Sequence, residues 1–175
     1  MSISISPDGR KFKFPTPEEN RKEIEKLKKI SEKQRRLGRK IVVVQGMGFV
    51  GCVMAAVVAD ATDKDGNPLY FVHWHQRVSR RSFWKIPIIN NGESPVHAED
   101  PEIPEIFPRC VKEKKTLRAT WSNYAYKLAD IVVVDIQLDA TKPDFGDAAT
   151  GYCDLSAFKS GMQVVGKNIS PECLI

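Results

Sequence analysis

The fold of this chain is decided by residues 41–56, which read IVVVQGMGFVGCVMAA. The β-branched run at 41–44 has no polar alternation, which is typical of a central parallel strand buried on both faces. Three glycines follow with the spacing G-x-G-x-x-G, and an alanine-rich helical pattern comes after them. A strand, a glycine turn and a helix in this order predict the first βα unit of a dinucleotide-binding domain.

Each glycine of this motif has its own physical task. Gly46 lets the chain turn sharply off the strand, Gly48 lets the backbone approach a pyrophosphate, and Gly51 lets the helix pack against the strand. The free N–H groups and the positive dipole end of the helix favour an anion there without any basic side chain. The alternative is that the glycines serve only a tight turn between strand and helix.

Length and composition limit the class of protein. The 175 residues and the hydrophobic content of 42% fit one domain with a sizeable core. No window approaches the roughly 20 apolar residues of a membrane span, and the polar start lacks a signal-peptide core. We therefore expect a cytoplasmic protein with no membrane partner. The four cysteines are scattered, which favours buried reduced thiols over a zinc site or a disulfide framework.

The positive charge is concentrated near the N-terminus. Residues 1–40 hold 13 of the 27 Lys and Arg and 6 of the 22 Asp and Glu, which leaves 14 basic against 16 acidic residues elsewhere. A solvated helical face explains this distribution better than a nucleic-acid site, which would interleave aromatic or base-reading side chains with the charges. We therefore expect no nucleic-acid partner.

Residues 1–39 form an expected basic N-terminal helical arm. Thr16, Pro17 and Glu19 predict the start of a helix with a capping box, and the helix should reach about Leu37. Its apolar stripe is thin, so it needs a surface to lie on, either in this domain or in a neighbouring subunit. The sequence does not decide between the two.

Residues 40–175 form the expected dinucleotide-binding domain. Strands are expected at 41–44, 69–75, 117–120 and 130–136, and helices at 49–61, 121–128 and 154–165. The basic segment 77–85 is expected to be partly helical and to be interrupted at Pro87, and a proline-rich excursion with one short helix follows at 93–108. This alternation predicts an α/β, Rossmann-like fold with a doubly wound parallel sheet and right-handed crossovers.

The ligand crevice of a doubly wound sheet lies at the carboxyl ends of its strands, where the winding reverses. This rule places the glycine loop and the strand ends at 75–77 and 136–138 around one site. The expected cofactor-binding residues are Gly46, Met47, Gly48, Phe49, Val50, Gly51, Gln76, Arg77, Arg81, Ile136 and Gln137. We expect no metal ligand, because His73 and His75 alternate on one strand without acidic or thiol partners, and we single out no catalytic residue.

Five segments resemble, in order, the N-terminal NAD-binding domain of UDP-glucose/GDP-mannose dehydrogenases. They are 46–51, 89–96, 117–120, 129–134 and 170–175. Many dinucleotide enzymes share the glycine motif, whereas the segment from Asn90 to Val96 is more particular. The resemblance runs from about residue 40 to the end, and residues 1–39 lie outside it.

The resemblance implies an enzyme that oxidises the C6 alcohol of a nucleotide sugar, a UDP- or GDP-sugar, to a carboxylate. It also implies two hydride transfers to a nicotinamide cofactor and a homo-oligomer at full length. The thiol nucleophile of the family and its helpers lie beyond the first domain. Since residues 173–175 begin like a core strand, we expect a truncated domain, a fragment of a longer enzyme that is inactive by itself.

Two departures from the family pattern concern the cofactor. The family usually has an acidic residue at the end of the second strand, whereas this chain has His75, Gln76 and Arg77, with Arg81 one turn further on. The resemblance implies NAD, but an amide followed by arginine makes NADP possible. The second departure is Gln137-Leu138-Asp139, which replaces a threonine-proline pair near the nicotinamide ribose.

Two other functions stay open at this stage. The first is a stand-alone dinucleotide-sensing regulatory module that engages a partner through its basic N-terminal helix. The second is a degenerate fold that binds nothing, although the intact glycine spacing argues against it. The sequence does not name the nucleotide sugar.

Overall fold

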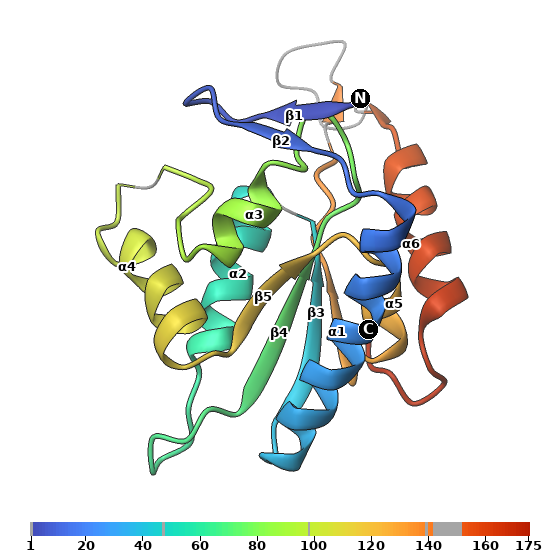
Figure 1. Ribbon diagram of the computed structural model, residues 1–175. Coiled ribbons are helices and arrows are strands. Elements are labelled where there is room, and N and C mark those ends of the chain that lie inside the picture. The colour runs from blue at the N-terminus through green and yellow to red at the C-terminus, as the bar shows by residue number, and fades with distance from the viewer. Residues whose placement is uncertain (1, 47, 98, 139, 142–151) are drawn as a thin grey trace.

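The structure, a computed structural model, describes residues 2–46, 48–97, 99–138, 140–141 and 152–175 (Figure 1). At its centre lies a parallel sheet of four strands in the order β5-β4-β3-β6. The strands are β3 (Lys40–Gln45), β4 (Tyr70–His75), β5 (Leu117–Thr120) and β6 (Ile131–Val134). From β3 the chain adds β4 and then β5 on one side, and it then crosses to the other side of β3 to form β6. The predicted α/β doubly wound class is therefore confirmed.

Helices cover both faces of the sheet (Figure 1). Val42 and Val44 of β3 face a core shared with α2 (Phe49–Asp60), α3 (Lys85–Asn90) and α4 (Glu102–Pro108). Val43 faces a second core shared with α1 (Pro17–Arg36), α5 (Tyr124–Lys127) and α6 (Ser156–Asn168). Because successive side chains of a strand point to opposite faces, an uninterrupted valine run serves both cores.

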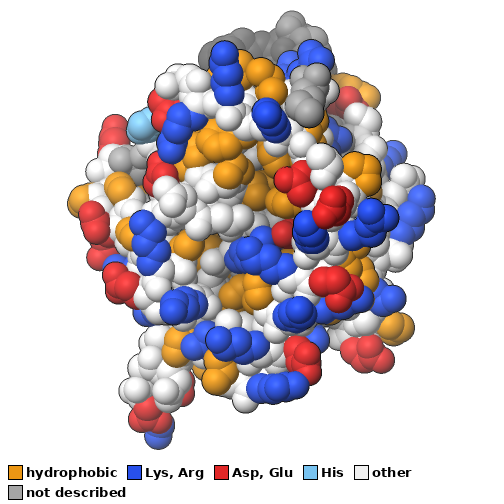
Figure 2. Space-filling model, viewed as in Figure 1, with side chains coloured by type: hydrophobic (Ala, Val, Ile, Leu, Met, Phe, Trp, Pro, Cys, Tyr) orange, Lys and Arg blue, Asp and Glu red, His pale blue; other side chains and the backbone are white. Residues whose placement is uncertain are grey.

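The N-terminal helix α1 lies on this domain. Its capping box is present: Glu19 N–H donates to Thr16 Oγ1 at 3.2 Å, and Thr16 N–H donates to Glu19 Oε2 at 2.7 Å. Leu27 is fully buried in the second core, next to Val43. Figure 2 shows that Lys and Arg side chains, with Asp and Glu among them, spread over the face that carries α1. The helix therefore has one buried face and one solvated, charged face.

A buried ion pair joins α1 to the edge strand β5. The Arg118 guanidinium contacts both carboxylate oxygens of Glu23, at 2.6 and 2.8 Å. Thr120 Oγ1 also donates to Glu23 Oε1, at 2.6 Å. The side chains of Arg118 and Glu23 are only 13% and 4% exposed. A bidentate, water-shielded pair of this kind fixes the position of the helix along the strand.

An N-terminal hairpin was not predicted from the sequence. It consists of β1 (Ile3–Ile5) and β2 (Lys11–Lys13), which pair antiparallel. Ser4 is buried, where its Oγ donates to the Arg80 carbonyl at 2.8 Å and accepts from Trp84 N–H at 3.1 Å. Strands of three residues with alternating polar side chains carry little hydrophobic periodicity, so this element depends on contacts with residues far along the chain.

Several predicted boundaries differ from those observed. Pro87 does not interrupt a helix, because it is the third residue of α3, where no earlier helical carbonyl needs its N–H. The π-helix η1 (Arg109–Glu113) extends α4 and was not predicted. The helix expected at 121–128 is α5 alone, and the strand expected at 130–136 ends at Val134. A further short antiparallel pair joins β7 (Ala140–Thr141) to β8 (Tyr152–Cys153).

The last residues meet the sheet beside β6. Leu174 forms a single parallel bridge with Ile131, and Val132 N–H donates to the Leu174 carbonyl at 2.8 Å. The extended segment expected there is therefore in place. Within the described parts of the chain, no helix is long and apolar enough to cross a membrane.

Candidate functional site

The glycine loop leaves β3 at the carboxyl edge of the sheet. Gly46 has a φ of +107°, in the region that favours glycine. A Cβ added there would overlap the carbonyl oxygen of Asp135, which lies directly after β6. Gly46 N–H donates to the His75 carbonyl at 3.3 Å, and the Gly46 carbonyl accepts from Trp74 Nε1 at 2.5 Å. Only glycine fits this position, because both the backbone angle and the neighbouring strand exclude a side chain.

Gly48 and Gly51 lie at the start of α2. Gly48 is the N-cap residue and has a φ of −72°, and a Cβ there would meet only Asp135 Oδ2, at 3.6 Å. Its lack of a side chain is therefore not required by the fold. A Cβ at Gly51 would lie 2.6 Å from Asp135 Oδ2 and 2.7 Å from the Gly46 carbonyl oxygen. Gly51 therefore allows α2 to approach the glycine loop and the residue that follows β6.

Sequence reasoning missed Asp135. Gly51 N–H donates to its Oδ2 at 2.6 Å, so this carboxylate caps α2 from a distant part of the chain. The N-cap Gly48 has no side chain to accept a hydrogen bond, and the first turn of α2 holds no acidic residue. The available signal was an acidic residue directly after a buried strand that neighbours the glycine loop.

The next predicted residues, Phe49 and Val50, occupy the first turn of α2 and are 56% and 61% exposed. Met47 lies outside the described residues. Since the two side chains point to solvent, the first turn of α2 lies at the molecular surface. An anion could approach its backbone from outside without displacing the core.

The end of β4 holds Gln76, Arg77 and Arg81. The Gln76 side chain lies within its own loop, where Nε2 donates to Ser82 Oγ at 2.9 Å. Arg77 and Arg81 are exposed, and neither forms an ion pair with a described residue. These two guanidinium groups, together with that of the exposed Arg80, are cations that the loop after this strand presents to solvent.

The end of β6 lies beside the other two strand ends, as predicted. Gln45 pairs in register with both His75 and Val134, and Asp135 N–H donates to the Gln45 carbonyl at 2.8 Å. The Ile136 side chain lies beside α6. A Cβ on Gly161 of α6 would overlap its Cδ1, so Ile136 packs against that helix. Gln137 is exposed and Asp139 lies outside the described residues.

His73 and His75 are buried on the α1 and α5 side of β4. His73 Nε2 shares a hydrogen bond with Ser31 Oγ at 2.9 Å, and His75 Nδ1 shares one with the Tyr126 hydroxyl at 2.8 Å. Burial lowers the pKa of His73 to about 3 and the pKa of His75 to about 4. Both rings are therefore neutral at pH 7 and serve packing. Across the described residues, no group of His, Cys, Asp and Glu is placed to hold a metal ion.

The buried histidines predict a loss of stability in mild acid. The unfolded chain binds a proton at each histidine below pH 6.5, whereas folded His75 does so only near pH 4. Its contribution to the free energy of unfolding is complete above pH 6.5 and falls by about 2 kcal/mol by pH 5. Urea unfolding at pH 7.5 and pH 5 measures this difference. His75→Phe should reduce it, and His97→Asn, at an exposed position, should leave it unchanged; an equal difference in His75→Phe contradicts the assignment.

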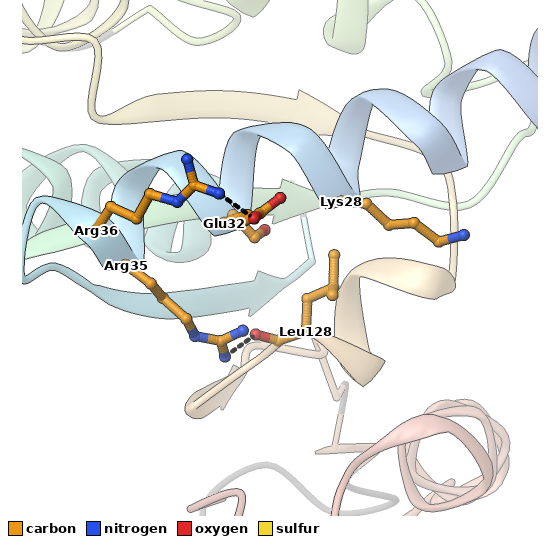
Figure 3. Close-up of a pocket in the computed structure, with 6 residues that line it drawn as sticks. Lys28, Glu32, Arg35, Arg36 and Leu128 are labelled. Atoms are coloured by element: carbon orange, nitrogen blue, oxygen red, sulfur yellow. Dashed lines mark hydrogen bonds and ion pairs between the residues drawn. The ribbon is translucent and has the colours of Figure 1, made fainter.

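A cavity of about 490 Å³ lies between α1 and the residue that follows α5, Leu128 (Figure 3). Its charged groups are already paired with protein atoms. Arg36 contacts Glu32, and Arg35 Nη2 donates to the Leu128 carbonyl at 2.8 Å and to Asp130 Oδ1 at 2.7 Å. This cavity therefore offers no unsatisfied charge to a ligand.

The structure is similar to solved nucleotide-sugar dehydrogenases. NDP-N-acetyl-D-galactosaminuronic acid dehydrogenase from Methanosarcina mazei Go1 is 32% identical over 86% of this chain, with a TM-score of 0.65. UDP-D-ManNAc dehydrogenase from Pyrococcus horikoshii is 20% identical over 77% of this chain (TM-score 0.58). GDP-mannose dehydrogenase from Pseudomonas aeruginosa is 21% identical over 71% (TM-score 0.51). The last two matches show the fold. No protein-family model and no curated protein matches the chain.

The chain spans only 24–28% of the length of these three structures. Residues 40–175 are 136 of the 175 residues, so a match that covers 86% of the chain also includes part of residues 1–39. The relationship therefore extends further toward the N-terminus than the sequence motifs indicated. The resemblance inferred from those motifs is confirmed: this chain is related to the nucleotide-sugar dehydrogenases and corresponds to the N-terminal region of their chains.

Proposed function

We propose that this chain is the cofactor-binding part of a dehydrogenase that oxidises the C6 alcohol of a UDP- or GDP-sugar to a carboxylate with NAD. The observation that carries the proposal is the glycine loop, which is held at the carboxyl end of the central strand beside the start of α2. The 32% identity to a nucleotide-sugar dehydrogenase supports the same reading. A cytoplasmic location and a homo-oligomeric full-length enzyme remain predictions.

The residues present fit a dinucleotide at this loop. Gly48 leaves open space at the start of α2, and the exposed first turn at Phe49 and Val50 provides N–H groups at the positive end of the helix dipole. A nicotinamide cofactor held there would supply the hydride acceptor for oxidation of the alcohol carbon. The chain binds and orients the pyrophosphate that carries the nicotinamide ring.

Gly48→Val tests the position of the pyrophosphate. The φ of −72° suits any residue and the nearest side-chain atom is 3.6 Å away, so the fold should survive. A branched side chain at the closest approach of the cofactor should weaken NAD binding by roughly a hundredfold, or about 2.7 kcal/mol. Calorimetry measures the affinity, and thermal unfolding checks the fold.

Gly166→Val is the matched control, because nothing lies within 4 Å of a Cβ on that residue of α6. Its NAD affinity should equal that of the parent. The assignment fails if the parent binds neither NAD nor NADP, or if Gly48→Val binds as tightly as the parent.

The arginines at the end of β4 decide the cofactor. If Arg77 or Arg81 reaches a 2′-phosphate, the contact contributes on the order of 1.5–3 kcal/mol, or roughly tenfold to a hundredfold in affinity. We propose NAD as the cofactor and NADP as an accepted alternative. Arg77→Ala should then weaken NADP binding and leave NAD binding unchanged in calorimetry. NADP acceptance is rejected if the parent binds NADP at least tenfold more weakly than NAD and Arg77→Ala does not change that ratio.

We propose that these 175 residues do not turn over the sugar by themselves. Oxidation of the aldehyde needs an activated thiol, and thiolates are the reactive form. Burial raises the pKa of Cys52 and of Cys110 to about 12, so both stay protonated at neutral pH. Burial also raises the pKa of Cys173. These thiols suit packing, which supports a role in cofactor binding alone.

The regulatory-module alternative is less well supported. It requires the N-terminal helix to engage a partner, yet the buried face of α1 already contacts this domain through Glu23, Leu27 and Ser31. Only the charged outer face of α1 remains for a partner.

A further inference from the structure

Asp135 places a carboxylate at the point where the glycine loop meets α2. Its Oδ2 accepts from Gly51 N–H at 2.6 Å and lies 3.6 Å from where a Cβ of Gly48 would stand. The backbone is held there as well, because a Cβ at Gly46 would overlap the Asp135 carbonyl oxygen. The carboxylate is therefore fixed beside the residue that a pyrophosphate would approach most closely.

The carboxylate and a pyrophosphate would use the same physical features. Both are anions that are stabilised by the orphan N–H groups and by the positive dipole end of a helix. Asp135 already takes the third N–H of α2, that of Gly51. A pyrophosphate at the first two N–H groups would therefore be attracted less by the helix dipole, which Asp135 partly neutralises. It would also be repelled by the adjacent carboxylate.

We propose that Asp135 is an affinity-determining residue that weakens the binding of a dinucleotide pyrophosphate at the glycine loop. The inference rests on the proposed function and adds to it a built-in limit on cofactor affinity. Like charges at contact distance near a protein surface repel strongly enough to change affinity about tenfold. The same carboxylate stabilises the ligand-free chain by capping α2. Replacing Asp135 with a neutral residue should therefore both tighten ligand binding and lower thermal stability.

The test compares the parent with Asp135→Asn and Asp135→Ser. Both variants remove the charge, and the Ser hydroxyl and the Asn amide oxygen are also good acceptors for helix N–H groups. Asp65→Asn, in the exposed loop between α2 and β4, changes the net charge equally and is the control. Calorimetry with NAD and with ADP-ribose, each in low and high salt, measures the binding affinity. Thermal unfolding measures how much the cap on α2 stabilises each variant.

We expect both Asp135 variants to bind NAD and ADP-ribose about tenfold more tightly than the parent in low salt, with a smaller gain in high salt. Their melting temperatures should fall slightly, because a neutral acceptor gives up the interaction of the charge with the helix dipole, and Asp65→Asn should match the parent in affinity. Equal or weaker binding by the variants while the parent binds overturns this inference and leaves the proposed function standing. If no form binds either probe, both are overturned.

Discussion

Gly46→Ala is expected to lower the free energy of unfolding by about 3–5 kcal/mol, because a left-handed backbone and a blocked side-chain position add together. The φ of +107° disfavours any L side chain. The new methyl group would also overlap the carbonyl oxygen of Asp135, which is backbone and part of the segment that leaves β6. To remove this overlap, the glycine loop and that segment must move apart, which breaks the hydrogen bond from Gly51 N–H to Asp135.

Two other glycines separate these causes. Gly66 has a φ of +83° with nothing within 4 Å of a Cβ, so Gly66→Ala measures the backbone cost alone, about 1 kcal/mol. Gly48 has neither constraint, so Gly48→Ala should be nearly neutral. Urea unfolding followed by circular dichroism ranks the three variants. If Gly46→Ala lowers the free energy of unfolding no more than Gly66→Ala does, the glycine loop can move away from the segment after β6 at little cost, and this prediction is wrong.

The elements that could be predicted are those whose cause is local. The valine run, the glycine spacing and the capping box at Thr16 each fix a structure within one or two turns of chain, and all three are present. The rule that carboxyl ends of parallel strands share one edge then placed the ends of β3, β4 and β6 together. Register confirms this through Gln45, which pairs with His75 and with Val134.

The parts that could not be predicted depend on contacts between distant residues. Asp135 caps a helix that starts more than eighty positions earlier, with no spacing to reveal it. Ile136 stays a predicted cofactor-site residue, and its contact with α6, where a Cβ on Gly161 would overlap its Cδ1, has no signal in the local sequence. Asn90 lies in the segment from Asn90 to Val96, the most specific part of the family resemblance. Its side-chain amide accepts from Ala119 N–H at 2.8 Å and donates to the Ala119 carbonyl at 3.0 Å. These two hydrogen bonds satisfy backbone groups of the edge strand β5.

Glu23→Ala is expected to destabilise the chain by about 3–5 kcal/mol, because it leaves the Arg118 charge buried without its partner. Loss of the Glu23 carboxylate would also leave Arg118 next to a second cation, Lys26. The nearby Arg118 cation is the main cause that lowers the pKa of Lys26, burial adds to the effect, and Glu23 opposes it. Without Glu23 the two cations face each other and Thr120 loses its acceptor. Chemical denaturation at pH 7.5 measures the loss.

The double variant Glu23→Met with Arg118→Met distinguishes a costly orphan charge from a favourable ion pair. Removal of both charges together should restore much of the stability, because apolar replacements of a buried pair are often neutral. Unfolding should remain one transition for every variant, since α1 shares the second core with Val43 and Val132. If Glu23→Ala instead releases α1 to proteolysis while the sheet unfolds at the denaturant concentration of the parent, residues 1–39 are an arm that folds independently of the domain.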